Sequence, residues 1–171
     1  QKEVYLKADI SFKDLQFTID GRCDGLLFRD GAVIIDEIKS TSQPLEHLGQ
    51  EGLPVHWAQA KMYAYIYAKD HKLQEIFGQL TYVHVESDEK KYLKKCFTFE
   101  ELDAFVHEVV ESYYPYAKLL HDHRKARNES SKQLVFPFES YRAGQRKLAG
   151  GVYKTISEEK SLFVKAPTGI G

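Results

Sequence analysis

The chain has 171 residues, a length that suits one domain together with part of a second. Hydrophobic residues make up 43% and charged residues 29% of the chain, so we expect a folded core and no overall disorder. The formal net charge of −1 argues against a protein that coats nucleic acid through a globally basic surface. No apolar run approaches the about 20 residues of a membrane span, and no signal peptide is visible. We therefore expect a cytoplasmic protein with no membrane partner.

The first forty residues predict an antiparallel meander of three strands. Apolar and polar residues alternate over residues 4–12 and again over residues 15–24, which is typical of half-buried strands. A third strand is expected over residues 32–40, where the run Val33-Ile34-Ile35 indicates burial on both faces.

The turn between the second and third strands sets a register. Asp30-Gly31 is a strong signal for a two-residue hairpin loop, because that turn needs positive φ angles. With these two residues as the loop, Asp24 faces Glu37 across the hairpin and Arg22 faces Lys39.

This register predicts a metal site. Glu37 and Lys39 share one face of their strand, whereas Asp36 points to the other face. Opposed residues hold their Cβ atoms about 5 Å apart, and two carboxylates that close repel unless something positive lies between them. A divalent cation such as Mg²⁺ takes oxygen ligands, and a lysine beside a metal-bound water can be a catalytic partner. The alternative is a solvated hairpin in which Lys39 is a salt-bridge partner.

A helix is predicted over residues 55–72, after a loop rich in glycine and proline. Gln59 and Tyr63 are four residues apart and therefore lie on one face of this helix. Taken alone, Tyr63 is better explained by core packing than by ligand contact, because Tyr65 and Tyr67 lie in the same helix.

A second hairpin and a long helix follow. Strands are expected over residues 80–86 and 92–97, and Thr98 followed by Glu101 is a capping box that opens a helix running to residue 128. Residues 129–135 are predicted to be a linker. It would separate a domain of residues 1–128 from a second segment, residues 136–171, with a helix over 142–156 and a strand over 161–165.

Three motifs occur in order on the predicted elements. They are Gly21-Arg22-Cys23-Asp24-Gly25, Ile34-Ile35-Asp36-Glu37-Ile38-Lys39 and Gln59-Ala60-Lys61-Met62-Tyr63. Together they resemble the fingerprint of the PD-(D/E)XK nuclease superfamily, and most closely that of its RecB-like exonucleases. The resemblance implies an α/β fold of the restriction-endonuclease-like kind. In that fold a mixed central sheet, made of an antiparallel meander and further strands, is flanked by helices.

The resemblance also implies roles for single residues. Asp24 and Glu37, with the carbonyl of Ile38, would bind Mg²⁺ or Mn²⁺. Lys39 would orient or activate the attacking water and offset charge in the transition state.

On the helix, Gln59 and Tyr63 would support the site and touch the DNA strand. The implied activity is metal-dependent hydrolysis of DNA, as an exonuclease in repair or recombination. One departure from the family is the absence of a histidine before the first strand, since the first histidine is His47. A DNA-binding module without catalytic activity is therefore the alternative function.

The last part of the chain has a resemblance of its own. Residues 136–145 are similar to the adenine-sensing Q motif of XPD/DinG-like DNA helicases, and residues 166–171 look like the front of a Walker A loop. The Lys-Ser or Lys-Thr pair that completes such a loop is missing, so ATP would be bound only by a longer parent protein, a nuclease fused to a helicase. The implied nucleotide-binding residues are Tyr141, Arg142, Gln145, Thr168, Gly169 and Gly171.

Overall fold

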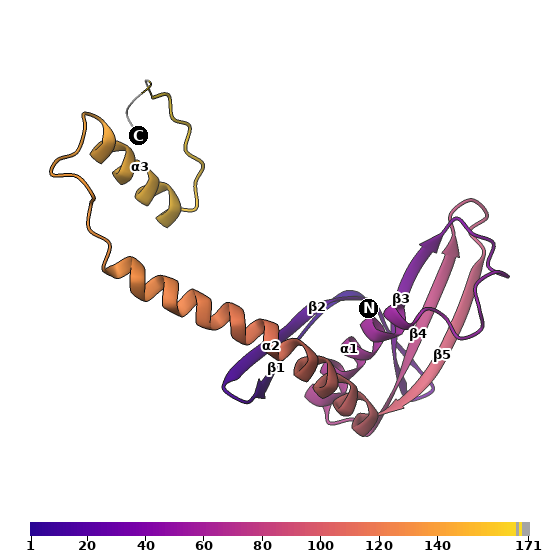
Figure 1. Cartoon of the computed structure of the whole chain (residues 1–171). Coiled ribbons are helices and arrows are strands. Elements are labelled where there is room, and N and C mark those ends of the chain that lie inside the picture. The colour runs from indigo at the N-terminus through magenta and orange to yellow at the C-terminus, as the bar shows by residue number, and fades with distance from the viewer. Residues whose placement is uncertain (167, 169–171) are drawn as a thin grey trace. The chain divides into compact units, whose positions relative to one another are not determined.

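The computed structural model describes residues 1–166 and residue 168. The chain divides into two compact units, Gln1–Asp122 and His123–Gly171. The first unit contains a five-stranded sheet in the order β1-β2-β3-β4-β5, shown in Figure 1. The strands are β1 (Lys2–Phe12), β2 (Leu15–Arg29), β3 (Ala32–Thr41), β4 (Glu75–His84) and β5 (Lys90–Thr98).

The sheet is mixed. β3 pairs with β4 in parallel, whereas the pairs β1–β2, β2–β3 and β4–β5 are antiparallel. Parallel neighbours need a crossover connection, and helix α1 (Pro54–His71) supplies it between β3 and β4. Both the predicted meander and the predicted fold class, a mixed sheet with helices, are confirmed.

The β2–β3 hairpin has the predicted turn. Asp30 and Gly31 both have positive φ, 50° and 77°, and the ladder runs from Arg29 opposite Ala32 to Gly25 opposite Asp36. The predicted register is therefore confirmed over this stretch.

Beyond Gly25, the prediction is wrong in one respect. Among the described residues, neither Asp24–Glu37 nor Arg22–Lys39 is a rung of the β2–β3 ladder, which ends at Gly25. Among the described strands, the residues of β2 before Gly25 pair with β1 alone, Cys23 lying opposite Val4, and the Asp24 side chain, not a backbone group of β2, accepts the N–H of Ile38. β2 and β3 thus separate at the point where a regular ladder would have continued.

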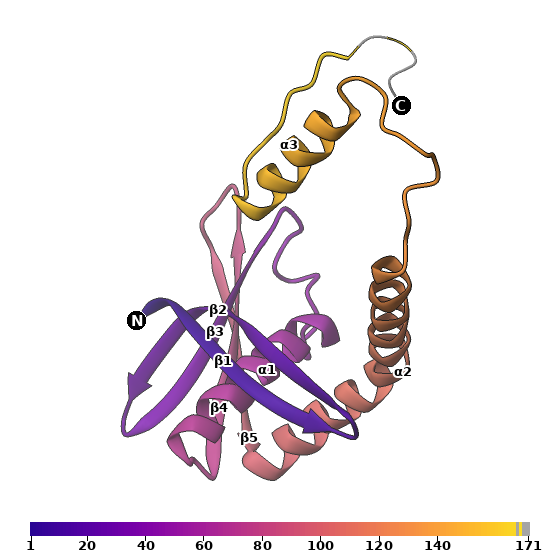
Figure 2. The same ribbon diagram turned by 90° about the vertical axis from the view of Figure 1, so that its left-hand side faces the viewer.

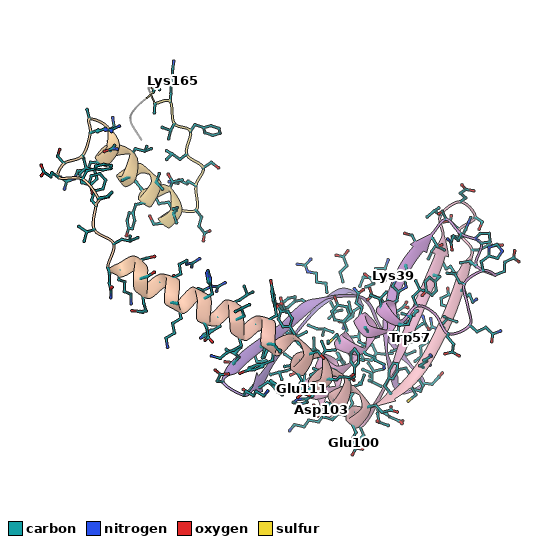
Figure 3. All side chains as sticks on the ribbon, in the orientation of Figure 1. Lys39, Trp57, Glu100, Asp103, Glu111 and Lys165 are labelled. Carbon is teal, nitrogen blue, oxygen red and sulfur yellow. The ribbon has the colours of Figure 1, made fainter. Side chains whose placement is uncertain are left out.

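Small residues let α1 lie close to the sheet. Ala60, Ala64 and Ala68 follow one another at intervals of four residues and are fully buried, so they form one stripe along the helix. Trp57 extends the stripe and meets Phe97 of β5 edge-on, with the ring centroids 5.9 Å apart. Figure 2 shows α1 against the strands, and Figure 3 labels Trp57 on it.

Helix α2 (Phe99–Lys132) opens with the predicted capping box. The Thr98 N–H donates to Glu101 Oε2 at 2.9 Å, and the Glu101 N–H donates to Thr98 Oγ1 at 3.2 Å. The helix continues to Lys132, so residues 129–132, expected in a linker, are its last turn. An ion pair between Lys132 and Glu129 at 2.8 Å supports that turn. Among residues 1–166 and 168, no helix is long and apolar enough to cross a membrane.

The second unit contains helix α3 (Gln145–Ser157). It begins three residues later than predicted, because Gly144 before it has a φ of 90° and is not helical. Residues 161–165, expected to form a strand, are not one, since no strand lies within the second unit's described residues to pair with them. Of the predicted Walker A positions, Thr168 is exposed, whereas Gly169 and Gly171 lie outside the described residues.

Candidate metal and nuclease site

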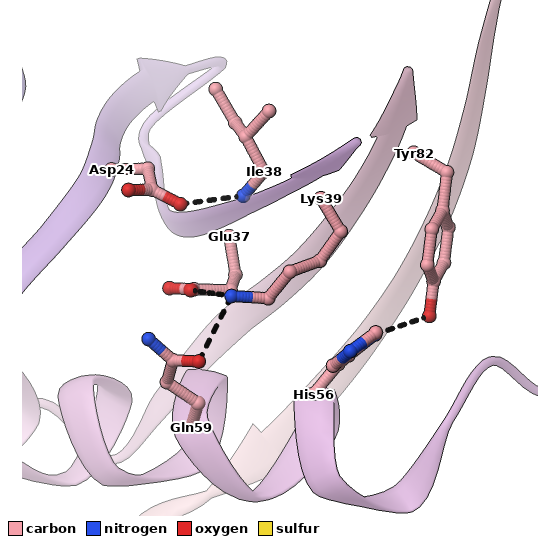
Figure 4. A network of polar contacts seen from close by, with 7 residues as sticks. All are labelled: Asp24, Glu37, Ile38, Lys39, His56, Gln59 and Tyr82. Carbon is pink, nitrogen blue, oxygen red and sulfur yellow. Dashed lines mark hydrogen bonds and ion pairs between the residues drawn. The ribbon is translucent and has the colours of Figure 1, made fainter. Parts of the chain in front are cut away.

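Asp24 bridges the point where β2 and β3 separate. Its Oδ2 accepts a hydrogen bond from the backbone N–H of Ile38 at 2.8 Å, drawn in Figure 4. A side chain thus takes the place of a ladder partner. The N–H and C=O of one strand residue point to the same edge, so the Ile38 carbonyl also faces the edge of β3 at which the Asp24 carboxylate lies.

Glu37 is the most deeply buried acid of the site. It is 1% exposed, and its Oε1 lies 2.6 Å from the ammonium of Lys39. Its second oxygen, Oε2, is buried and has no hydrogen-bond partner among the described residues. Burial raises the pKa of Glu37, Lys39 lowers it, and the negative charge of Asp24 raises it further. A buried carboxylate with a free oxygen therefore lies close to a second carboxylate.

Lys39 connects the strand to helix α1. Its Nζ donates to Glu37 Oε1 and also to Gln59 Oε1, at 3.0 Å. A lysine ammonium has three donors, so one remains for a water or a substrate oxygen. Gln59, predicted to touch DNA, therefore holds the lysine in place.

Tyr63 lies over β2. A Cβ atom placed on Gly21 would come within 2.7 Å of the Tyr63 hydroxyl oxygen, so the glycine of the first motif leaves room for this ring. Tyr63 is partly buried against the hydrophobic core. It packs helix α1 against the strand that carries Asp24.

Adding a methyl group at Gly21 should destabilise the fold. We expect Gly21→Ala to cost about 1 kcal/mol or more of unfolding free energy, because overpacking displaces the tyrosine ring. The loss should be smaller in a Tyr63→Phe background, which removes the closest atom. Urea denaturation of the parent, the two single variants and the double variant measures this coupling. If Gly21→Ala lowers the unfolding free energy equally with Tyr63 and with Phe at that position, the contact is contradicted.

The Asp36 side chain lies on the opposite face of the sheet from Glu37. Its Oδ1 accepts hydrogen bonds from Thr81 Oγ1 at 2.6 Å and from Gln79 Nε2 at 3.1 Å, and all three residues are buried. Gln79 Nε2 also donates to Thr81 Oγ1 at 3.1 Å. Asp36 is thus satisfied by protein partners, unlike its neighbour Glu37.

His56 was not predicted as a site residue. It lies three residues before Gln59 in α1, and its Nδ1 is 2.9 Å from the hydroxyl of Tyr82. Figure 4 draws this contact. The helical spacing of His56, Gln59 and Tyr63, at intervals of three and four, was the signal that could have found it.

The residues present fit a small hard cation. No group of three or more His, Cys, Asp or Glu side chains that could hold a metal ion occurs in residues 1–166 and 168. Mg²⁺, however, is usually bound through one or two carboxylates together with waters and substrate phosphates. Asp24, Glu37 and the Ile38 carbonyl supply oxygen donors of this kind, and a cation would satisfy the free Oε2 of Glu37.

The raised pKa of Glu37 has a consequence for stability. A carboxyl with a higher pKa in the folded state binds its proton more tightly there, so its contribution is present at acidic pH and lost as the pH rises through that pKa. Glu37→Gln removes this loss. In EDTA, we expect the variant to gain stability relative to the parent between about pH 4 and pH 8. Urea denaturation of both proteins at about pH 4 and at about pH 8 tests this. If the difference in unfolding free energy between variant and parent is the same at the two pH values, the prediction is refuted.

The predicted nucleotide-binding residues of the second unit are only partly brought together. Tyr141 stacks on Phe136 with the ring centroids 4.0 Å apart. The Arg142 N–H donates to the side-chain oxygen of Gln145, the first residue of α3, at 2.8 Å. This bond closes the turn before the helix.

Comparison with known proteins identifies the family. The family described as the PD-(D/E)XK nuclease superfamily matches residues 2–157. The chain belongs to this superfamily. Its members are nucleases, which are metal-dependent hydrolases, and the match includes every residue of the site above.

Other comparisons are less extensive. No curated protein matches the chain. The crystal structure of SSO0001 is similar over 65% of this chain and 49% of that chain, with 20% sequence identity and a TM-score of 0.38. The chain thus spans about half the length of that structure.

Proposed function

We propose that the chain is a Mg²⁺- or Mn²⁺-dependent deoxyribonuclease that hydrolyses phosphodiester bonds as an exonuclease in DNA repair or recombination. The observation that carries this proposal is the buried, unpartnered Oε2 of Glu37, close to Asp24 and beside the Lys39 ammonium. The superfamily membership supports it.

Asp24, Glu37 and the Ile38 carbonyl would hold the cation. When bound, a divalent cation polarises the phosphoryl oxygen and lowers the pKa of a bound water. The protein's own contribution lies in Lys39, whose ammonium is held by Glu37 and Gln59. Its third N–H orients the attacking water and offsets negative charge on the phosphorane-like transition state.

End-labelled linear DNA and closed circular DNA test the proposal. We expect the full chain to shorten linear DNA from an end with Mg²⁺ or Mn²⁺, to leave circles intact, and to lose activity in EDTA. Cleavage of the circular DNA would indicate an endonuclease instead of an exonuclease. DNA left intact with both metals would overturn the nuclease proposal.

The second candidate is a DNA-binding module without catalytic activity. The observation that favours it is the absence, among the described residues, of a third metal-ligating side chain beside Asp24 and Glu37. DNA binding without cleavage, at saturating Mn²⁺, is the result that would select it.

The parent protein is proposed to be a nuclease fused to an XPD/DinG-like helicase that begins near residue 136. The Q-motif resemblance of residues 136–145 supports this, with Tyr141, Arg142 and Gln145 as nucleotide-contacting residues. The proposed Walker A positions are Thr168, Gly169 and Gly171, and ATP binding would need the longer protein. The codons after Gly171 test the fusion, because a Walker A loop requires Lys-Ser or Lys-Thr there.

A further inference from the structure

His56 occupies the first turn of α1, on the side of the helix that carries Gln59 (Figure 4). Its ring lies against Tyr82, with the centroids 5.6 Å apart and Nδ1 2.9 Å from the hydroxyl. Tyr82 is only 2% exposed. The imidazole is therefore held by a buried residue of β4.

The hydrogen bonds determine which nitrogen carries the proton. The backbone N–H of Leu53 donates to the Tyr82 hydroxyl oxygen at 3.2 Å. If Nδ1 of His56 also donated to this oxygen, the hydroxyl proton would be buried without an acceptor, which is unfavourable. The hydroxyl therefore donates to Nδ1, and the neutral imidazole carries its hydrogen on Nε2.

The Nε2–H group is not fully buried. Within the described part of the chain, Glu37 Oε2 is the buried side-chain polar atom that lacks a partner. Nε2 of His56 also has no hydrogen-bond partner there, so it is not buried. Burial and then the charge of Lys39 lower the pKa of His56. The imidazole thus stays neutral and lies within electrostatic reach of Lys39.

We propose that His56 is a further substrate-contacting residue, whose Nε2–H donates a hydrogen bond to a phosphate oxygen of the bound DNA strand beside Lys39. Tyr82 acts as its positioning residue by fixing the tautomer. This inference rests on the proposed nuclease function. A rigid neutral donor next to a lysine suits a phosphodiester, because phosphate oxygens accept hydrogen bonds from both.

Three variants of the full chain test the inference. His56→Ala removes the donor, whereas His56→Gln keeps an N–H group near the Nε2 position, and Tyr82→Phe frees the ring to change tautomer. Fluorescence anisotropy with a labelled DNA strand in EDTA measures affinity, and steady-state cleavage separates KM from kcat. We expect His56→Ala to weaken binding and raise KM about tenfold, a loss typical of one phosphate contact, with kcat within about threefold of the parent. His56→Gln should recover most of the loss.

The matched control is His107→Ala, because His107 lies on α2 and contacts Asp103 across the helix surface. ¹⁵N NMR of the imidazole adds a readout that needs neither metal nor DNA. It should show the Nε2–H tautomer in the parent and a mixture in Tyr82→Phe. Parental affinity and KM in His56→Ala, or an Nδ1–H tautomer, would overturn the inference while the parent still cleaves. A parent that neither binds nor cleaves DNA would instead overturn the proposed function.

Discussion

Lys39→Ala is expected to lower kcat of metal-dependent DNA cleavage by about 10³-fold, within the range for a group that stabilises transition-state charge. The Lys39 side chain is 24% exposed and its ammonium is held by Glu37 and Gln59, so alanine leaves no cation in its place. KM should change little, because the charge that Lys39 is proposed to offset develops in the transition state. Single-turnover cleavage of a labelled DNA strand measures the effect.

A suitable control is Lys7→Ala. Lys7 is an exposed lysine of β1, and its strand partner is Asp20 of β2. Lys7→Ala changes the net charge by the same amount as Lys39→Ala but leaves the residues of the candidate site unchanged. If both variants cleave DNA at the parental rate, Lys39 has no catalytic role and the alternative, a simple salt bridge with Glu37, accounts for its position.

Glu37 and Asp36 are neighbours on β3, but only removal of the Glu37 charge should affect metal binding and cleavage. We expect Glu37→Gln to abolish stabilisation by Mg²⁺ or Mn²⁺ and to reduce cleavage by about 10³-fold. Asp36→Asn should retain both, because its Oδ1 can still accept hydrogen bonds from Thr81 and Gln79. The difference arises from strand alternation, which sends the two side chains to opposite faces of the sheet.

Thermal unfolding with increasing metal separates the two variants. A ligand at 100 times its dissociation constant stabilises a protein by about 2.7 kcal/mol, which corresponds to roughly 5 °C or more for a domain of this size. The parent and Asp36→Asn should show this shift, and Glu37→Gln should not. A shift that disappears in Asp36→Asn and persists in Glu37→Gln would place the metal on the other face.

Local chemistry made much of the fold predictable. The Asp30-Gly31 turn requires positive φ at both residues, and this requirement alone fixed the register of the hairpin down to Gly25. The capping box of Thr98 and Glu101 likewise marked the start of α2. In each case the determining residues are close together in the sequence.

The features that were missed depend on distant partners. Before Gly25, β2 pairs with β1 and no longer with β3, and no pattern within the hairpin marks that point. The bond from Ile38 to Asp24 follows from the separation and was not foreseen. His56 was missed because its partner, Tyr82, comes from β4.

We propose that Asp24, Glu37 and the carbonyl of Ile38 bind a divalent cation beside Lys39. Anomalous diffraction from crystals soaked in Mn²⁺ tests it most directly. We predict a peak within coordination distance of Glu37 Oε2 and the Asp24 carboxylate. At saturating Mn²⁺, an empty position there, or a peak at Asp36 instead, would contradict the claim.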